Sequence, residues 1–288
     1  MAVVAAKLGE QVQAILVKRI AENSLVVPAP PTVVTRVLKA VGEATFSQKE
    51  AAPLVEGDTV VAARVVRAAS DQQPGEAVNT LADALSRLGA EPLREVLIEI
   101  STHRLFESRD ARIGEHTRGL WQHSVAVALL ARELADLGHV SAGEAAYLAG
   151  LLHDIGKPVV AFLLLEAEKS AISAKSAWIE PEAWLEVVQR VHRPIGVALA
   201  RKWGLPSAVA AAIAECGAPR QDEGASVGNC VRLANALAKR AGLYVGSVDR
   251  AEVDAQVAAG LALLKLDDAS VNTISEEVAQ RARAMTSE

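Results

Sequence analysis

The chain has 288 residues, of which 51% are hydrophobic and only 3% aromatic, so a sizeable core must be built from alanine, valine and leucine. It carries 30 basic and 35 acidic residues, and this formal charge of −5 argues against a nucleic-acid-binding protein with a basic stripe. No apolar run approaches the ~18 residues that span a membrane, and the N-terminus lacks the apolar core of a secretory signal. We therefore expect a cytoplasmic protein that binds neither nucleic acid nor a membrane.

Apolar residues recur at helical spacing along the chain, and no segment alternates as a strand would, which predicts an all-α protein. Asp58 and Thr80 are expected to cap helices, and Gly89 is expected to end one. In the first part of the chain, the expected helices cover residues 3–22, about 32–41, a short segment opened by Ser47 and Glu50, about 59–69, 81–88 and about 91–106.

A polar segment at 109–117 is predicted to connect two lobes. The expected helices of the second lobe cover 120–138, 141–156 (with a capping box of Ser141 and Glu144), about 158–170, 181–190, 193–206 and 207–216. Residues 217–226 are rich in Gly, Pro and charged residues and are predicted to be a linker to two or three terminal helices.

The segment AGLLHDIGKPV, residues 149–159, places His153 and Asp154 side by side in an apolar run. Buried charge is costly unless it is paired or bound to a metal. His123 lies on an apolar helical stripe and His192 just before Pro194. Three histidines and an aspartate suit one divalent transition metal, which could activate water for phosphoester hydrolysis. The alternative is a buried polar network in which His153 and Asp154 cap helix ends.

Two further residues have a plain structural interpretation. Lys157 could contact a phosphate, but we expect it to interact with the carbonyl groups at the end of its helix. Cys216 has no paired base in the sequence, and we expect a buried small residue rather than a nucleophile.

The order His…His-Asp…His resembles a known family. The segments LWQHSVAVALLA, EAAYLAGLLHDIGK and VHRPIGVALARKWGLP are similar to the HDOD domain, a bacterial signalling relative of the HD phosphohydrolases. The resemblance covers residues 25–219 and implies a two-lobed helical fold. It implies the following parts: an N-terminal helix at 1–24, a first lobe at about 25–108, an HD-like lobe at about 118–219 and a helical extension at 220–288.

The chain also departs from this pattern. Where the metal-dependent relatives carry a His-His pair, this chain has Cys216 and Gly217, and Asn235 stands nearest to their closing aspartate. The resemblance therefore implies that a two-metal site is dismantled. It leaves at most one weakly held metal at four residues, which are His123, His153, Asp154 and His192. No catalytic or cofactor-binding residue is predicted, and no cofactor is expected beyond that one divalent transition metal.

The favoured hypothesis is a non-catalytic regulatory module of bacterial signal transduction that uses the helical surface between its lobes to bind another protein. The resemblance implies a signalling partner in trans, either a response regulator or a cyclic-nucleotide turnover protein, with a nucleotide as a further candidate ligand. The alternative is a metal-dependent HD-type phosphohydrolase or cyclic-dinucleotide phosphodiesterase with a reduced ligand set. The missing His-His pair and aspartate favour the first.

Overall fold

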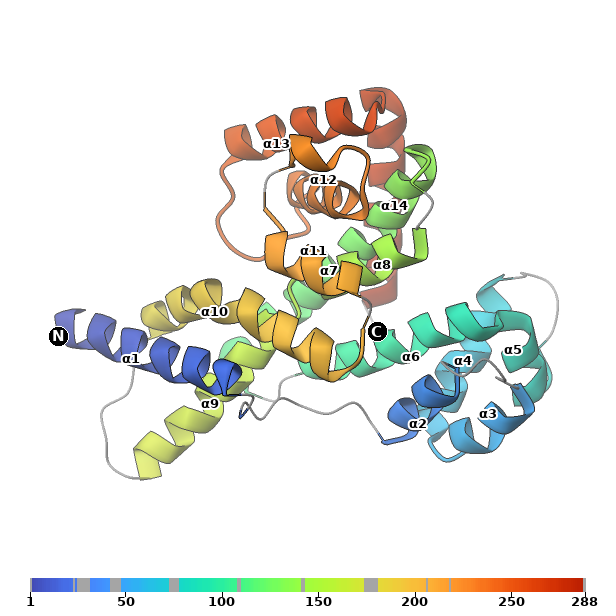
Figure 1. Cartoon of the computed structure of the whole chain (residues 1–288), viewed down its shortest axis with the longest axis horizontal. Coiled ribbons are helices and arrows are strands. Elements are labelled where there is room, and N and C mark those ends of the chain that lie inside the picture. The colour runs from blue at the N-terminus through green and yellow to red at the C-terminus, as the bar shows by residue number, and fades with distance from the viewer. Residues whose placement is uncertain are drawn as a thin grey trace. The chain divides into compact units, whose positions relative to one another are not determined.

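The computed structural model describes residues 2–22, 24, 32–41, 48–72, 78–107, 110–140, 143–173, 181–205, 207–217 and 219–286. Over these residues the chain forms α-helices, a short 3-10 helix and turns, without a strand, which confirms the predicted all-α class (Figure 1). They divide into two compact units: unit 1 is Met1–Val27 with Phe106–Glu288, and unit 2 is Pro28–Leu105.

Unit 2 is a bundle of short helices with an aliphatic core. Its helices are α2 (Thr32–Val41), α3 (Gln48–Val55), α4 (Thr59–Gln72), α5 (Leu81–Leu88) and α6 (Ala90–Phe106), the last residue of which belongs to unit 1. The core cluster consists of Val, Ala, Leu and Ile, as the low aromatic content predicts. The predicted caps are confirmed: Asp58 Oδ1 accepts from the N–H groups of Val60 and Val61, and Thr80 Oγ1 accepts from that of Asp83.

Unit 1 is organised around one long central helix, α7 (Ala111–Leu137). The other helices of this unit are α1 (Ala2–Ala21), α8 (Gly143–Leu152), α9 (Gly156–Ser173), α10 (Pro181–Lys202), α11 (Ser207–Glu215), α12 (Val227–Arg240), α13 (Arg250–Leu264) and α14 (Asp268–Thr286). Helices α8, α12 and α14 pack against α7, and α1 packs against α10. Every residue from 123 to 131 is buried, so α7 is enclosed on all sides there. The C-terminal helices thus belong to the same compact unit as α7.

The crossing of α7 and α8 depends on a glycine. A Cβ atom placed on Gly150 would lie 2.8 Å from the Cα atom of Ala128 on α7. Without a side chain at Gly150, the backbones of α7 and α8 come into direct contact, and the end of α8 that carries His153 is held close to α7.

The start of α7 corrects one prediction. The segment 109–117 was expected to be a connector, but from Ala111 onward it is helical. Although the segment is polar, one face of it is buried. Gly114 and Thr117 lie on this face, and Thr117 Oγ1 donates a hydrogen bond to the Gly114 carbonyl. Small and weakly polar residues can line a buried helix face without an apolar stripe, and the sequence pattern therefore missed this turn of the helix.

The predicted helices at 181–190 and 193–206 are in fact one helix, α10, which continues through Pro194. Proline removes one hydrogen bond to the carbonyl four residues earlier, here that of Arg190. Both Pro194 and Arg190 are exposed, so water can satisfy that carbonyl. The prediction that a new helix begins near His192 was wrong for this reason.

The predicted linker at 217–226 is tied to α12 rather than free. The side chain of Asn229 accepts from the N–H of Arg220 at 2.8 Å and donates to the carbonyls of Arg220 and Gly224 at 2.7 Å each. The buried guanidinium of Arg232 donates to the Glu215 carbonyl at 3.0 Å and pairs with Glu223. Ser47 and Ser141, the expected first residues of two capping boxes, lie outside the described residues.

One stretch, Ala145–Lys169, is apolar and long enough to cross a membrane by composition, but 83% of its most apolar window is buried inside the folded chain. It contains the turn between α8 and α9, so it consists of two core helices of unit 1.

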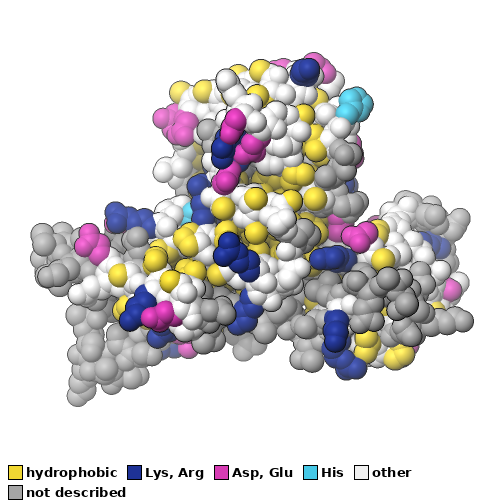
Figure 2. All heavy atoms as spheres, viewed as in Figure 1, with side chains coloured by type: hydrophobic (Ala, Val, Ile, Leu, Met, Phe, Trp, Pro, Cys, Tyr) yellow, Lys and Arg dark blue, Asp and Glu magenta, His cyan; other side chains and the backbone are white. Residues whose placement is uncertain are grey.

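On the face shown in Figure 2, the coloured Lys and Arg side chains lie among Asp and Glu side chains rather than in one stripe, in line with the net charge.

Candidate functional site

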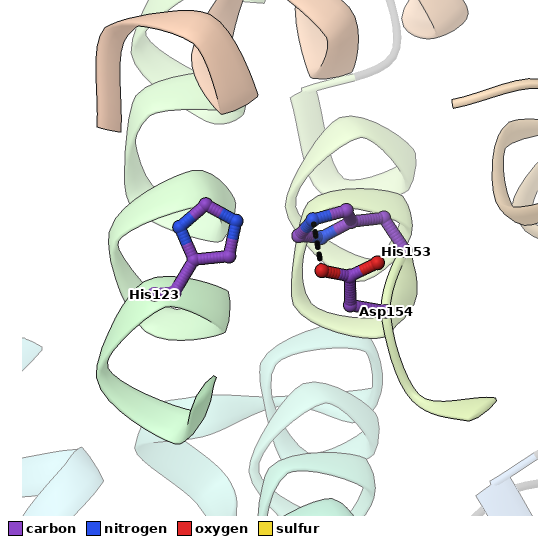
Figure 3. A group of neighbouring side chains, drawn as sticks. All are labelled: His123, His153 and Asp154. Atoms are coloured by element: carbon purple, nitrogen blue, oxygen red, sulfur yellow. Dashed lines mark ion pairs between the residues drawn. The ribbon is translucent and has the colours of Figure 1, made fainter. Parts of the chain in front are cut away.

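A cluster of ionisable side chains lies buried inside unit 1. His123 projects from α7 toward His153 and Asp154, which follow the end of α8 (Figure 3). Lys157 comes from the first turn of α9, and His192 from the middle of α10. We call these five residues the His–Asp cluster, and each is less than 10% exposed. The structure thus brings together all four residues predicted as metal ligands, together with one that was not.

A second glycine brings α10 to the cluster. A Cβ atom on Gly156, the first residue of α9, would lie 1.7 Å from the backbone oxygen of His192. The two helices therefore touch backbone to backbone at this point. This contact carries the imidazole of His192 to Asp154, with 3.7 Å between Nε2 and Oδ1.

In each of the three histidines, Nδ1 lies within hydrogen-bond distance of a backbone carbonyl oxygen. His123 Nδ1 is 2.6 Å from the carbonyl oxygen of Leu243, and His153 Nδ1 is 2.7 Å from that of Gly150. His192 Nδ1 is 2.9 Å from the carbonyl oxygen of Gln189. A carbonyl only accepts, so Nδ1 carries the hydrogen in each ring and Nε2 of the neutral ring presents a lone pair. This is the orientation that second hydrogen bonds impose on metal-binding histidines.

The carboxylate of Asp154 is the negative centre of the cluster. Lys157 Nζ donates to its Oδ2 at 2.5 Å, and His153 Nε2 lies 3.4 Å from the same oxygen. Burial opposes ionisation, but the neighbouring His153 and Lys157 hold the pKa of Asp154 well below its ordinary value. Burial likewise disfavours the charge on Lys157, yet Asp154 raises the lysine pKa above its usual value. Asp154 and Lys157 therefore form a buried pair of opposite charges.

His123 is neutral at physiological pH, because burial lowers its pKa to about 3. Burial also lowers the pKa of His192. Since Lys157 already neutralises Asp154, the uncharged rings of His123 and His192 add no charge to this part of the core.

The donor atoms fit one divalent metal. The Nε2 atoms of His123 and His153 are buried and have no hydrogen-bond partner. One ring nitrogen of each of these histidines and one carboxylate oxygen of Asp154 lie within 4.8 Å of one another. Imidazole and carboxylate ligands suit Zn, Fe or Mn. A metal at this position would compete with Lys157 for Asp154, which makes the site a weak one.

Two of the three positions where the resemblance implies missing ligands, Cys216 and Asn235, lie together in the structure. Asn235 Nδ2 donates to the sulfur of Cys216 at 3.6 Å, and both residues are buried. Burial, reinforced by Asp154, raises the pKa of the Cys216 thiol to about 11, so the thiol is protonated. This confirms that Cys216 is buried, and neither side chain adds a charged ligand.

The contact of Lys157 differs from the one predicted from the sequence. This residue was expected to contact helix carbonyls, but it pairs with Asp154 because the spacing of three residues places the two side chains on one side of the turn into α9. That spacing was a usable signal. Leu243, which holds His123, lies 120 residues away along the chain, and no local pattern could have revealed it.

The depressed pKa of His123 predicts a pH-dependent stability. Below pH 6.5 the unfolded chain binds a proton on this histidine, whereas the folded chain binds it only near pH 3. The stability that depends on a neutral His123 is therefore fully present above pH 6.5 and is lost as the pH falls below that value. We expect the free energy of unfolding to drop by about 2 kcal/mol between pH 7.5 and pH 5, measured by urea unfolding. His123→Gln should flatten this slope, and an unchanged slope in that variant would contradict the assignment.

The helical fold and the order of its buried histidines and aspartate define an HD-like domain. The model of the HDOD domain family matches residues 27–219, about two thirds of the sequence. The chain belongs to the HDOD domain family. A search among curated proteins finds no match.

Solved structures share the fold over nearly the whole chain. A protein of Shewanella amazonensis, named as a candidate metal-dependent phosphohydrolase, superposes with a TM-score of 0.69 at 21% identity and covers 96% of this chain and 99% of its own. An HDOD domain protein of Geobacter sulfurreducens gives 0.66 at 20%, covering 100% and 99%. A candidate signal transduction protein of Marinobacter aquaeolei gives 0.62 at 22%, covering 98% of this chain but 65% of its own. At these identities the similarity shows the fold alone.

Proposed function

We propose that the protein is a non-catalytic regulatory module of bacterial signalling, located in the cytoplasm, that acts by binding another protein. The observation that carries this proposal is the buried contact between Lys157 and Asp154. The ammonium group of Lys157 is paired with the carboxylate that a catalytic metal would need as a ligand. The neutral side chains of Cys216 and Asn235 stand at positions where further ligands would be required. The His–Asp cluster then serves as a polar core that fixes the meeting point of four helices.

Membership of the HDOD family supports a signalling role. We propose that the HDOD domain takes up residues 25–219, with the helices on either side as extensions, and that the partner is a response regulator or a cyclic-nucleotide turnover protein acting in trans. The name of the Marinobacter aquaeolei protein, a signal transduction protein, points the same way.

The second candidate function is a single-metal phosphohydrolase, and it is favoured by one observation. Two buried Nε2 atoms without a hydrogen-bond partner lie near a carboxylate, which is an arrangement that a metal would complete. His123, His153 and Asp154 would hold the ion, with His192 beside Asp154. A bound divalent metal would supply a water of lowered pKa for attack on a phosphoester.

The two functions differ in turnover. The purified chain, loaded with Mn²⁺ or Zn²⁺, is assayed with bis(p-nitrophenyl) phosphate beside the variants His123→Ala and Asp154→Asn. We expect the wild-type rate to equal the rates of both variants and of free metal. A wild-type rate at least tenfold higher, lost in both variants, would overturn the regulatory proposal and establish the hydrolase.

A further inference from the structure

A cavity of about 370 Å³ lies between the end of α12 and the start of α13 (the α12–α13 cavity). Its lining consists of Lys239, Arg240, Gly242, Tyr244, Gly246, Val248, Arg250, Val253 and Asp254. Helices α12 and α13 pack against each other and are joined by a loop (Figure 1). Four residues of this loop belong to the lining, namely Gly242, Tyr244, Gly246 and Val248. All of these residues follow residue 219, where the family match ends.

The lining is positively charged. Lys239 and Arg240 come from the last turn of α12 and Arg250 from the first position of α13, and Asp254 is the one acidic residue of the lining. Arg240 is held by the Asn272 side chain at 2.5 Å and lies 3.9 Å from Asp268. The amides at the start of α13 are capped by Asp249. The charge that a ligand would meet therefore comes mainly from Lys239 and Arg250.

We propose that the α12–α13 cavity binds a small organic phosphate, such as a mononucleotide or a sugar phosphate. A phosphate group suits convergent lysine and arginine side chains. The volume falls within the ~300–1,000 Å³ typical of small-molecule sites and exceeds what a phosphate ion alone would fill. Val248 and Val253 supply an apolar wall for the organic part.

The cavity adjoins the His–Asp cluster through Tyr244. The tyrosine ring lies 5.2 Å from the His123 ring, centroid to centroid. Lys239 Nζ is 5.1 Å from the centre of this ring, and Lys157 Nζ is 5.4 Å from it. The preceding residue, Leu243, accepts the hydrogen bond of His123. A ligand in the cavity would thus touch the loop that positions His123, so this site supplies a route for a metabolite signal to reach the core. The binding proposal itself does not depend on the protein-binding function.

The test is calorimetric titration of the full chain at low salt with AMP, ribose 5-phosphate, inorganic phosphate and adenosine. We expect at least one phosphate ester to bind at least tenfold more tightly than inorganic phosphate and adenosine. The double variant Lys239→Gln with Arg250→Gln should weaken that binding at least tenfold. Arg250→Glu, which changes an exposed side chain, repeats the test with less risk to folding.

The matched control removes the same two charges elsewhere. Arg201 and Lys202 are exposed at the end of α10 and do not line the cavity, so Arg201→Gln with Lys202→Gln should leave binding within twofold of wild type. Failure of both esters to bind at about 5 mM, a concentration above the millimolar dissociation constants of weak ligands, would overturn the proposal. Equal losses in the cavity variants and the control would overturn it as well.

Discussion

Replacement of Lys157 by methionine is expected to lower the free energy of unfolding by about 3–5 kcal/mol, because it leaves the buried carboxylate of Asp154 without its cation. The side chains of the pair are 6% and 9% exposed, so water can replace little of the lost interaction. Methionine keeps most of the volume of the lysine stem, which separates the loss of charge from the loss of packing. Urea unfolding followed by circular dichroism measures the change.

The same helix offers a matched control. Lys169 pairs with Glu166 at the same spacing of three residues, with 2.7 Å between Nζ and Oε1, but these side chains are 70% and 50% exposed. Lys169→Met should therefore cost less than about 1 kcal/mol. Equal effects of the two substitutions would show that the Lys157–Asp154 pair has no special role in stability.

A metal titration of the same variant tests the donor set. Without Lys157, Asp154 regains an open oxygen beside the Nε2 atoms of His123 and His153, and Zn²⁺ could replace the missing positive charge. We expect Zn²⁺ to raise the melting temperature of Lys157→Met more than that of wild type. Equal shifts in the two proteins would show that the lysine does not compete with a metal.

Replacement of Gly156 by alanine is expected to destabilise the protein by at least about 3 kcal/mol, at the upper end of the cost of overpacking. The new methyl group would lie 1.7 Å from the backbone oxygen of His192, so α9 and α10 would have to move apart. A flexible side chain could yield at such a contact, but a helix backbone cannot do so locally. The separation would also withdraw His192 from Asp154. Thermal and urea unfolding give the size of the loss.

Gly217→Ala is the control for this substitution. Gly217 does not have a positive φ, and a Cβ atom there would meet nothing closer than the Glu215 carbonyl oxygen at 4.0 Å. We expect a change within about 0.5 kcal/mol of wild type. If Gly156→Ala were as mild, the close contact between α9 and α10 would be wrong.

Local sequence patterns were sufficient for most helices and for the buried histidines. The stripe on α7 predicted that His123 faces the core, and the caps at Asp58 and Thr80 located two helix starts, because both signals depend only on residues within a few turns. The same patterns failed at Pro194 and at residues 109–117. At these two places, whether the residues form a helix depended on which face of the helix is exposed or buried. The spacing of residues alone does not indicate this.

The sequence by itself determined the helical class, the order of the histidines and the absence of ligand residue types at Cys216 and Asn235. Tertiary structure alone decided which carbonyl holds His123, how His192 reaches Asp154 and which cations meet in the α12–α13 cavity. Each of these depends on contacts between segments that are distant in the sequence, and the approach of His192 rests on Gly156, where the backbones of α9 and α10 are too close for a side chain. The His–Asp cluster could bind a metal, but its carboxylate, that of Asp154, is paired with Lys157. An unpaired buried carboxylate would cost more free energy than one that is paired with the nearest ammonium group.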